Sequence, residues 1–205
     1  LRVLAAAWRG AWTGRLVGLT GSNGKTTTKD FLASLLTAQS PCLATRGNLN
    51  NHFGVPLTLL RRDEDDRYAV VEMGMNHRHE ISALAEIAEP TIGVLTNVRP
   101  NHLDWHRSLE HYAASKQAIF SASPACAAPR RVDAARCPWR TDVLSELRLS
   151  VPGTHNRENA IDAIATIVEH LAVVDGALTW PTVPAGLEPR NPRNIAVVPG
   201  GVGWK

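Results

Sequence analysis

The stretch GLTGSNGKTTTKDF, residues 18–31, decides the fold of this chain. It begins inside LVGLT (16–20), an apolar run typical of a buried strand, and leads into a helical pattern from about Thr26. A strand, a glycine turn, Gly-Lys-Thr and a helix, in this order, are what a phosphate-binding P-loop requires. Gly21 and Gly24 let backbone N–H groups converge on phosphate oxygens, and the helix adds the positive end of its dipole.

The motif is a shorter variant of the strict pattern G-x-x-x-x-G-K-S/T. That pattern requires glycine at position 19, where this chain has Leu19, so the loop is G-S-N-G-K-T, residues 21–26. In such a loop we expect Lys25 to reach the β- and γ-phosphates of a nucleotide and Thr26 to bind Mg²⁺. A glycine turn that only caps a helix is the alternative, but it does not explain why all the parts of the motif occur together.

Strand and helix patterns alternate along the rest of the chain. YAVVEMG (68–74) and TIGVLTNV (91–98) are typical of buried strands, and EISALAEIA (80–88) is typical of a helix closed by Pro90. This alternation predicts an α/β fold: a P-loop-containing, mostly parallel sheet with helices on both faces.

The first sixty residues hold three further elements. A short strand is expected at PCLAT (41–45), while VPLTLL (55–60) is apolar and ambiguous between strand and helix. A helix is expected at 1–12, and its apolar face combines Leu1, Leu4, Ala5, Trp8 and Trp12.

Two helices are expected in the second half of the chain. Ser108 is suited to cap a helix that runs through Phe120, and Asn156 is suited to cap the helix at 155–173. No elements are assigned within 121–150. The later helix is expected to turn inward Ala160, Ile161, Ile164, Ile167, Val168 and Leu171.

Composition excludes several classes of protein. The 205 residues carry a net charge of +3 with scattered basic residues, which argues against nucleic acid as a partner. No apolar run approaches the length of a membrane span. The three cysteines lack a metal-type spacing and are odd in number, so a reducing cytosol and a cytoplasmic location are expected. Because the chain starts at Leu1 and ends in a Pro/Gly-rich stretch, we expect a piece of something longer.

Two segments after strands carry candidate metal ligands. Glu72 ends one predicted strand, at the sheet edge where ligands of parallel sheets bind, and its carboxylate suits Mg²⁺. TNVRPNHLDWH (96–106) follows the next strand, and His102 with Asp104 two residues later is the second candidate. His106 is interpreted as a solvated loop histidine.

Lys116 is the most informative residue outside the loop. It lies four residues after Tyr112 and four before Phe120, on a helical face that is otherwise apolar. Burial lowers the pKa of a lysine, and a neutral amine can add CO₂ to become a carbamate, an anionic metal ligand. A lysine that reaches the surface remains the alternative. The apolar residues of that face are Leu109, Tyr112, Ala113, Ile119 and Phe120.

Taken together, these motifs resemble the central ATPase domain of the Mur ligases, which make the amide bonds of the peptidoglycan stem peptide. The motifs that fall in the family's order are TGSNGKTTTK, VVEMG, TNVRPNHLD, YAASKQAIF and HNRENA. GNLNNHFGVPLTLL (47–60) is most like the member that adds D-alanyl-D-alanine. The resemblance is strong over residues 8–120 and moderate over 150–170.

The resemblance implies roles for individual residues. Lys25, Lys116 and His102 are implied in catalysis. ATP is implied to contact Gly21, Ser22, Asn23, Gly24, Lys25, Thr26, Thr27, His155 and Asn159. Two Mg²⁺ ions are implied, with ligands Thr26, Glu72, His102 and Lys116, the last as a carbamylated lysine. A UDP-muramoyl peptide is implied to meet Asn50 and Asn51.

The implied reaction is an ATP-dependent ligation in peptidoglycan precursor synthesis. The substrate carboxylate becomes an acyl phosphate and is then joined to an amino acid or to D-Ala-D-Ala. The partners are thus small molecules, and a monomer is expected. The implied organisation is an initial helix and linker at 1–14, an ATP-binding central domain at 15–178, and a linker toward a missing C-terminal domain at 179–205.

Four alternatives stay open from the residues. NVRPNHLDWHRSLEHYAASK (97–116) looks more like the sister ligases, which leaves the incoming amine open. A nucleotide-binding module without full activity fits the missing domains, and a folylpolyglutamate-type ligase fits the superfamily. A P-loop kinase would use an Arg-rich lid, for which 121–150 is the candidate, whereas the base-reading NKxD sequence of a GTPase is absent.

Overall fold

The computed structural model describes residues 1–99, 108–121, 130–131 and 153–166. Within these residues, five strands form one parallel sheet in the order β2-β3-β1-β4-β5. The strands are β1 Arg15–Thr20, β2 Cys42–Ala44, β3 Tyr68–Glu72, β4 Ile92–Leu95 and β5 Arg130–Arg131. The helices are α1 Arg2–Gly10, α2 Lys25–Thr37, α3 Gly54–Leu59, α4 Glu80–Ala88, α5 Leu109–Gln117 and α7 Thr154–Thr166. The predicted α/β class with a parallel sheet is confirmed.

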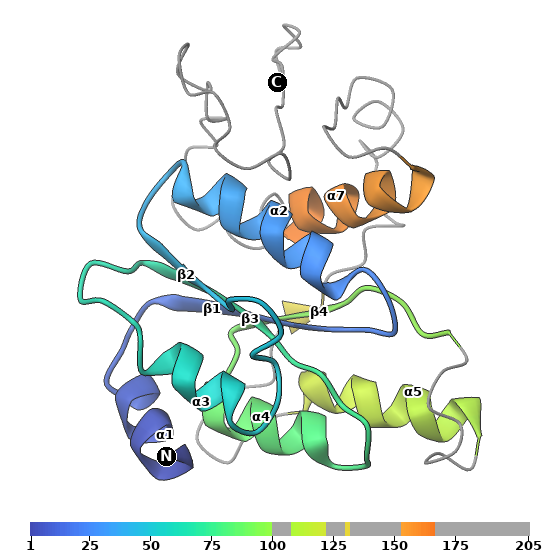
Figure 1. Ribbon diagram of the computed structural model, residues 1–205, viewed down its shortest axis with the longest axis horizontal. Helices are drawn as coiled ribbons and strands as arrows, with labels where there is room; N and C mark the ends of the chain where they lie inside the picture. Colours follow the sequence, from blue (N-terminus) through green and yellow to red (C-terminus); the bar gives the residue numbers. More distant parts are fainter. Residues whose placement is uncertain (100–107, 122–129, 132–152, 167–205) are drawn as a thin grey trace, which may run out of the picture.

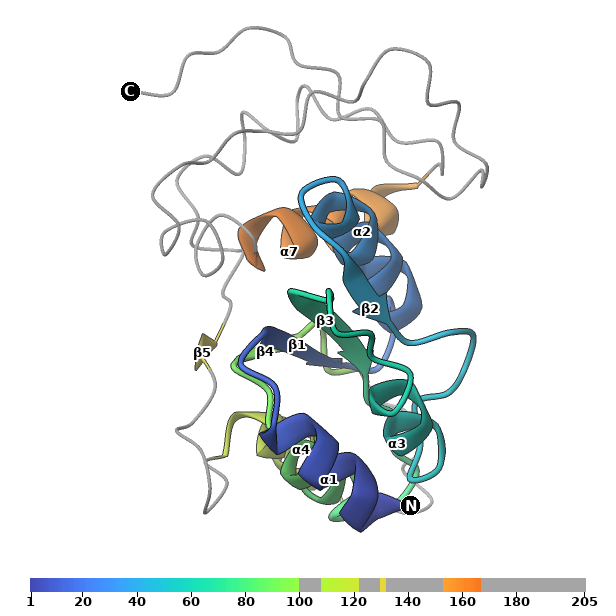
Figure 2. The same ribbon diagram turned by 90° about the vertical axis from the view of Figure 1, so that its left-hand side faces the viewer.

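Helices cover both faces of the sheet. Helices α2 and α7 lie on one face, whereas α1, α3, α4 and α5 lie on the other (Figures 1 and 2). Alternate residues of β1 enter two separate cores: Leu16 packs on the α4 side, while Val17 and Leu19 pack on the α2 side. The same alternation holds in β3 for Val70 and Val71. Each central strand is therefore buried on both faces, as a parallel sheet requires.

Strand β1 is central and carries the chain to the functional edge. It pairs with β3 on one side and with β4 on the other, so that Leu19 lies beside both Glu72 and Val94. The strand order reverses at β1, and ligands of such sheets bind beyond the carboxyl ends of the strands at this point. Thr20 and Glu72 end their strands at this edge.

Helix α1 turns a different face inward from the one its apolar pattern suggests. Ala5 and Trp12 of the predicted face are buried, but Leu4 is 61% exposed and Trp8 38% exposed. Arg9 explains the choice, because its Nε and Nη2 donate to the carbonyls of Ala88 and Glu89 at 2.8 Å each. These bonds satisfy the carboxyl end of α4, so α1 docks by its arginine rather than by its longest apolar side chains.

The sequence also misplaced one helix cap and left one segment open. Asn156 was expected as the cap of the last helix, but α7 already begins at Thr154. Gly153, just before it, has a φ of 110° and is therefore not helical. Its carbonyl accepts from the Asn156 N–H at 3.2 Å. The ambiguous segment 55–60 is largely helical as part of α3.

Other expectations about the helices are confirmed. Ser108 caps α5, where its Oγ accepts from the His111 N–H at 3.3 Å. The chain continues from α5 as a 3-10 turn to Phe120. Ala160, Ile161 and Ile164 are buried in α7, whereas the other predicted inward residues of this helix lie outside the described residues. The proposed linker at 179–205 also lies outside them.

Arg9 should contribute strongly to stability. We expect Arg9→Ala to lower the free energy of unfolding by about 3 kcal/mol, because it leaves buried carbonyl groups without donors. Urea unfolding of both variants measures this, with the exposed Arg2→Ala on the same helix as the control, expected to change it by less than about 0.5 kcal/mol. Equal losses in the two variants would contradict the assignment.

Candidate functional site

The loop between β1 and α2 has the geometry of a phosphate cradle. Gly21 and Gly24 have φ angles of 154° and 82°, which favour glycine. A Cβ at Gly24 would collide with the Asn159 amide, and one at Gly21 would collide with the Thr96 hydroxyl. Both glycines are thus required by backbone conformation and by a close neighbour, and the loop opens directly into the first turn of α2.

The segment after β4 fixes the loop from outside. The Asn97 side chain pairs with the backbone of Asn23 in both directions: Oδ1 accepts from its N–H at 3.1 Å, and Nδ2 donates to its carbonyl at 3.0 Å. The Thr96 hydroxyl donates to the same carbonyl at 2.7 Å. Ser22 Oγ donates to the Arg99 carbonyl at 3.1 Å and accepts from the Arg99 N–H at 2.9 Å. The loop conformation therefore depends on the segment that follows β4.

Lys25 stands at the mouth of the loop. Its Nζ donates to the Gly21 carbonyl at 3.0 Å and to the Ser22 carbonyl at 3.2 Å. Burial lowers the pKa of Lys25, and the nearby Glu72 carboxylate opposes that shift. The amine is positioned beside the cradle formed by the glycines, where a phosphate would replace the two carbonyls as its partner.

Glu72 is the buried carboxylate of the site. It is 1% exposed, and its Oε2 accepts from the Thr26 hydroxyl at 3.0 Å. Its Oε1 accepts from the Asn50 amide at 2.8 Å, and its backbone N–H donates to the Thr45 hydroxyl at 3.0 Å. The structure thus brings together Thr26 and Glu72, two of the three predicted metal ligands that lie within the described residues, the third being Lys116.

The donor set fits Mg²⁺. The Thr26 hydroxyl and the Glu72 carboxylate are hard oxygen donors in direct contact, beside a cradle suited to phosphate oxygens. No group of three or more His, Cys, Asp or Glu side chains is placed to hold a metal ion in the described part of the chain. Thr26 and Glu72 are the described residues that would hold Mg²⁺ beside a phosphate. His102, Asp104 and His106 fall within 100–107, outside the described residues, and His102 as a ligand stays a prediction.

Lys116 is buried, as its position on the helix predicted. It is 2% exposed, and its Nζ lies 4.7 Å from the centre of the Tyr112 ring. Burial, and next the positive charge of Lys25, lower the pKa of Lys116 to about 8. The Tyr112 hydroxyl lies 3.3 Å from Ser22 Oγ, within hydrogen-bond distance, so one aromatic side chain joins the loop to this lysine.

The remaining predicted residues divide between the loop and its surroundings. Asn159 of α7 is 6% exposed and its amide lies against Gly24, while its contact with ATP stays a prediction. His155 is exposed in the first turn of the same helix, and Thr27 lies in the first turn of α2.

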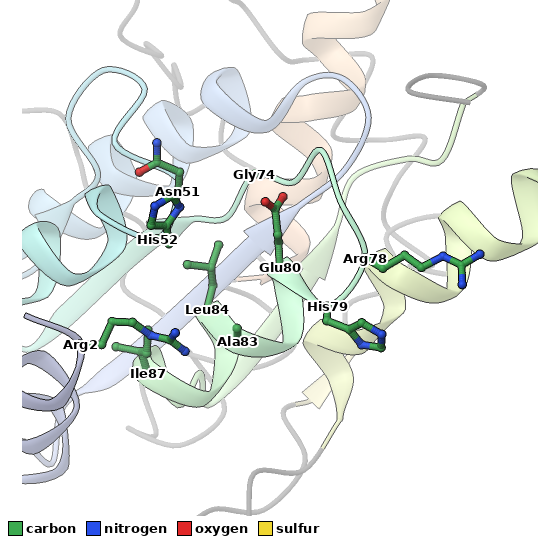
Figure 3. A pocket seen from close by; sticks show the side chains of 10 residues that line it. All are labelled: Arg2, Asn51, His52, Gly74, Arg78, His79, Glu80, Ala83, Leu84 and Ile87. Carbon is green, nitrogen blue, oxygen red and sulfur yellow. The ribbon is translucent and has the colours of Figure 1, made fainter. Parts of the chain in front are cut away.

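Asn51 lies beside a cavity of about 250 Å³ on the α4 side of the sheet. Its Oδ1 accepts from the N–H groups of Phe53 and Gly54 at 3.1 and 2.9 Å, which fixes the start of α3. In Figure 3 Asn51 and His52 lie on one side of the cavity, and the apolar side chains of α4 line another. The residues that line the cavity are Arg2, Asn51, His52, Gly74, Arg78, His79, Glu80, Ala83, Leu84 and Ile87.

The sequence interpretation missed Asn97, and it assigned Asn50 to the muramoyl peptide and not to Glu72. Asn97 clamps the loop and Asn50 holds Glu72, yet each is a single polar residue in a loop. The only signal was position: Asn97 follows β4 at the same edge where the P-loop follows β1. No helix among the described residues has the length and apolar character to cross a membrane.

Comparison with known proteins identifies the family of this chain. A family model described as "Mur ligase middle domain" matches residues 19–129. A UDP-N-acetylmuramoyl-tripeptide–D-alanyl-D-alanine ligase from Synechocystis is 48% identical over 100 residues, 49% of this chain and 22% of that protein. MurF from Acinetobacter baumannii has a TM-score of 0.70 at 27% identity, covering 82% of this chain and 45% of that one.

A second solved structure, MurF from Thermotoga maritima in complex with ADP, has a TM-score of 0.66 at 25% identity. The match covers 82% of this chain and 48% of that one. The chain therefore spans less than half the length of each of these three proteins.

The lowered pKa of Lys116 predicts a pH dependence of stability. The folded amine loses its proton near pH 8 and the unfolded amine near pH 10.5, so the unfolded chain binds more protons between these values. We expect the free energy of unfolding to rise by about 1 kcal/mol per pH unit across this window, and to gain nothing from this group below it.

Urea unfolding in CO₂-free buffers at several pH values measures this effect against Lys116→Met, which keeps the chain length without the charge. The difference between wild type and variant should grow in favour of wild type as the pH rises. Parallel profiles would contradict the assignment.

Gly24→Ala should damage the loop. The added methyl group meets Asn159 and a left-handed backbone, so we expect a loss of about 1–3 kcal/mol in the free energy of unfolding. Gly10→Ala is the matched control, since Gly10 ends α1 and a Cβ there meets nothing within 4 Å. Thermal unfolding of both variants separates the two, and a loss in Gly10→Ala as large as in Gly24→Ala would contradict the prediction.

Proposed function

The chain belongs to the Mur ligase family, whose middle domain it contains, and from this premise we propose that it is the ATP-binding part of a peptidoglycan-precursor ligase. The observation that carries the proposal is the glycine loop with Lys25 at its mouth and the Thr26–Glu72 contact beside it. We assign this domain to residues 15–178. The ADP in the Thermotoga maritima MurF supports ATP as the nucleotide.

The loop would hold the phosphates of ATP. Its backbone N–H groups and the start of α2 stabilise negative charge, and Lys25 exchanges the carbonyls of Gly21 and Ser22 for phosphate oxygens. Asn159, which covers Gly24, and His155 on the same helix would contact the rest of the nucleotide.

Two Mg²⁺ ions belong to the proposal, with Thr26 and Glu72 as ligands near the loop and His102 and a carbamylated Lys116 with Glu72 at the second ion. When bound, Mg²⁺ supplies positive charge that offsets the phosphate charge. The buried amine of Lys116, with its pKa near 8, supports the carbamate because a neutral amine is the form that adds CO₂.

The reaction proposed is an acyl-phosphate ligation. The carboxylate of a UDP-muramoyl peptide attacks the γ-phosphorus of ATP, and ADP leaves. The amine of the incoming compound then attacks the acyl carbon, phosphate leaves, and an amide bond remains. The chain's own residues act by alignment and by charge. Lys25 would face the transferred phosphoryl group, and the fixed loop would hold the phosphates in the orientation that the attack requires.

The muramoyl peptide would approach from the cavity beside Asn51. That cavity is lined by Gly74, two residues after Glu72, so a carboxylate bound there would lie near the end of β3. Asn50 and Asn51 are the proposed contacts. D-alanyl-D-alanine is the proposed amine, because the Synechocystis relative is named for that reaction.

We propose that the protein is a cytoplasmic monomer whose partners are small molecules. A nucleotide-binding module without ligation is the second candidate, which the phosphate loop with Lys25 at its mouth supports equally. The two differ in whether ATP is consumed with both substrates present.

Lys25→Ala should abolish tight ATP binding. We expect Kd to rise by about 10- to 100-fold or more, because a charge-assisted bond to phosphate is lost. Calorimetry with Mg²⁺ on the 205-residue chain measures it, and thermal unfolding of the variant is the control for folding. Wild-type chain that does not bind ATP, or a variant that binds it equally well, would contradict the proposal.

A further inference from the structure

The Glu72 carboxylate is held on both of its oxygens by side chains from different parts of the chain. Thr26 of α2 donates to Oε2, and Asn50 of the loop between β2 and α3 donates to Oε1 at 2.8 Å. A hydroxyl that donates to Glu72 must turn its lone pairs elsewhere to bind a cation. The Asn50 amide nitrogen cannot bind a cation, so it can continue to donate to Oε1 and keep the carboxylate oriented when a cation is present.

The Asn50 amide is itself firmly placed. The Gly74 N–H donates to the Asn50 carbonyl at 2.8 Å, and the Asn50 N–H donates to the Asn48 carbonyl at 2.7 Å. Upstream, the Thr45 hydroxyl accepts from the Glu72 N–H at 3.0 Å. The loop from Thr45 to Asn50 is therefore fastened to the end of β3 on both sides of the carboxylate.

Gly74 leaves the space that this side chain occupies. A Cβ at Gly74 would lie 2.9 Å from Asn50 Oδ1 and 3.2 Å from its Nδ2. These atoms end a short side chain, so an added methyl group would displace the amide without a collision against backbone. Gly74→Ala is thus a way to move the Asn50 amide without removing it.

We propose that Asn50 is a positioning residue for the Glu72 carboxylate, orienting it to bind a divalent cation at the phosphate edge. The inference rests on the proposed metal role of Glu72. Residues that hydrogen-bond a metal ligand fix its orientation, and their loss weakens metal affinity by about 10- to 100-fold. Because Asn51 lines the neighbouring cavity, the same loop would couple the cavity wall to the cation site.

The test compares ATP binding with Mg²⁺ and with EDTA by calorimetry on the 205-residue chain, in wild type, Asn50→Ala, Gly74→Ala and the double variant. The ratio of the ATP affinities with Mg²⁺ and with EDTA measures how much the cation contributes to binding. Thermal unfolding shows whether each variant is folded. Asn48→Ala in the same exposed loop is the control. We expect Asn50→Ala to reduce the ratio by about 10-fold or more while binding in EDTA stays unchanged.

The double variant separates positioning from general damage. If Gly74→Ala acts through the Asn50 amide, it should lower the ratio in wild type and have no further effect in Asn50→Ala. Additive losses, or equal losses of binding with Mg²⁺ and with EDTA, would overturn the positioning role and indicate a structural one.

Two outcomes of the comparison between wild type and Asn50→Ala complete the test. A wild-type chain that binds ATP better with Mg²⁺, together with an unchanged Asn50→Ala ratio, overturns the inference alone. A wild-type chain without any Mg²⁺ dependence overturns both the metal role of Glu72 and the inference. If Asn50→Ala fails to fold, Gly74→Ala decides alone, since its predicted loss requires a displaced amide in a folded chain.

Discussion

The turn between β1 and α2 depends on hydrogen bonds from outside itself. Its glycines permit the conformation, but Asn97 and Thr96 select it by binding the Asn23 backbone as a paired strand would. The P-loop is therefore finished only when β4 has joined β1 in the sheet. Local sequence sets what the turn can do, and the parallel sheet sets what it does.

The second determinant of the site is its excess of positive charge. Lys25 and Lys116 lie close enough for the first to lower the pKa of the second, and Glu72 offsets part of this charge. Burial of two amines is unfavourable unless anions join them. Other interactions in the fold must offset this unfavourable free energy. The two amines make the site suited to phosphate and carboxylate ligands.

The sequence predicted the features that depend on local pattern. The P-loop spacing, the strand end at Glu72 and the burial of Lys116 follow from order and periodicity, and all three are found. Contacts between residues far apart in the chain could not be predicted from local pattern. Nothing in the sequence, for example, pairs Asn50 with a carboxylate 22 residues away. Periodicity likewise shows which residues of α1 share a face, but Arg9 decides which face is covered.

The contact of Lys25 with the carbonyls of Gly21 and Ser22 has a kinetic consequence. The loop reaches its shape with the help of its own lysine, so the entropy of ordering it is lost during folding and not during binding. A phosphate then has to displace one side chain, an event of picoseconds to nanoseconds, rather than wait for a loop to close. Association would be limited by encounter, and differences in nucleotide affinity would appear as differences in residence time.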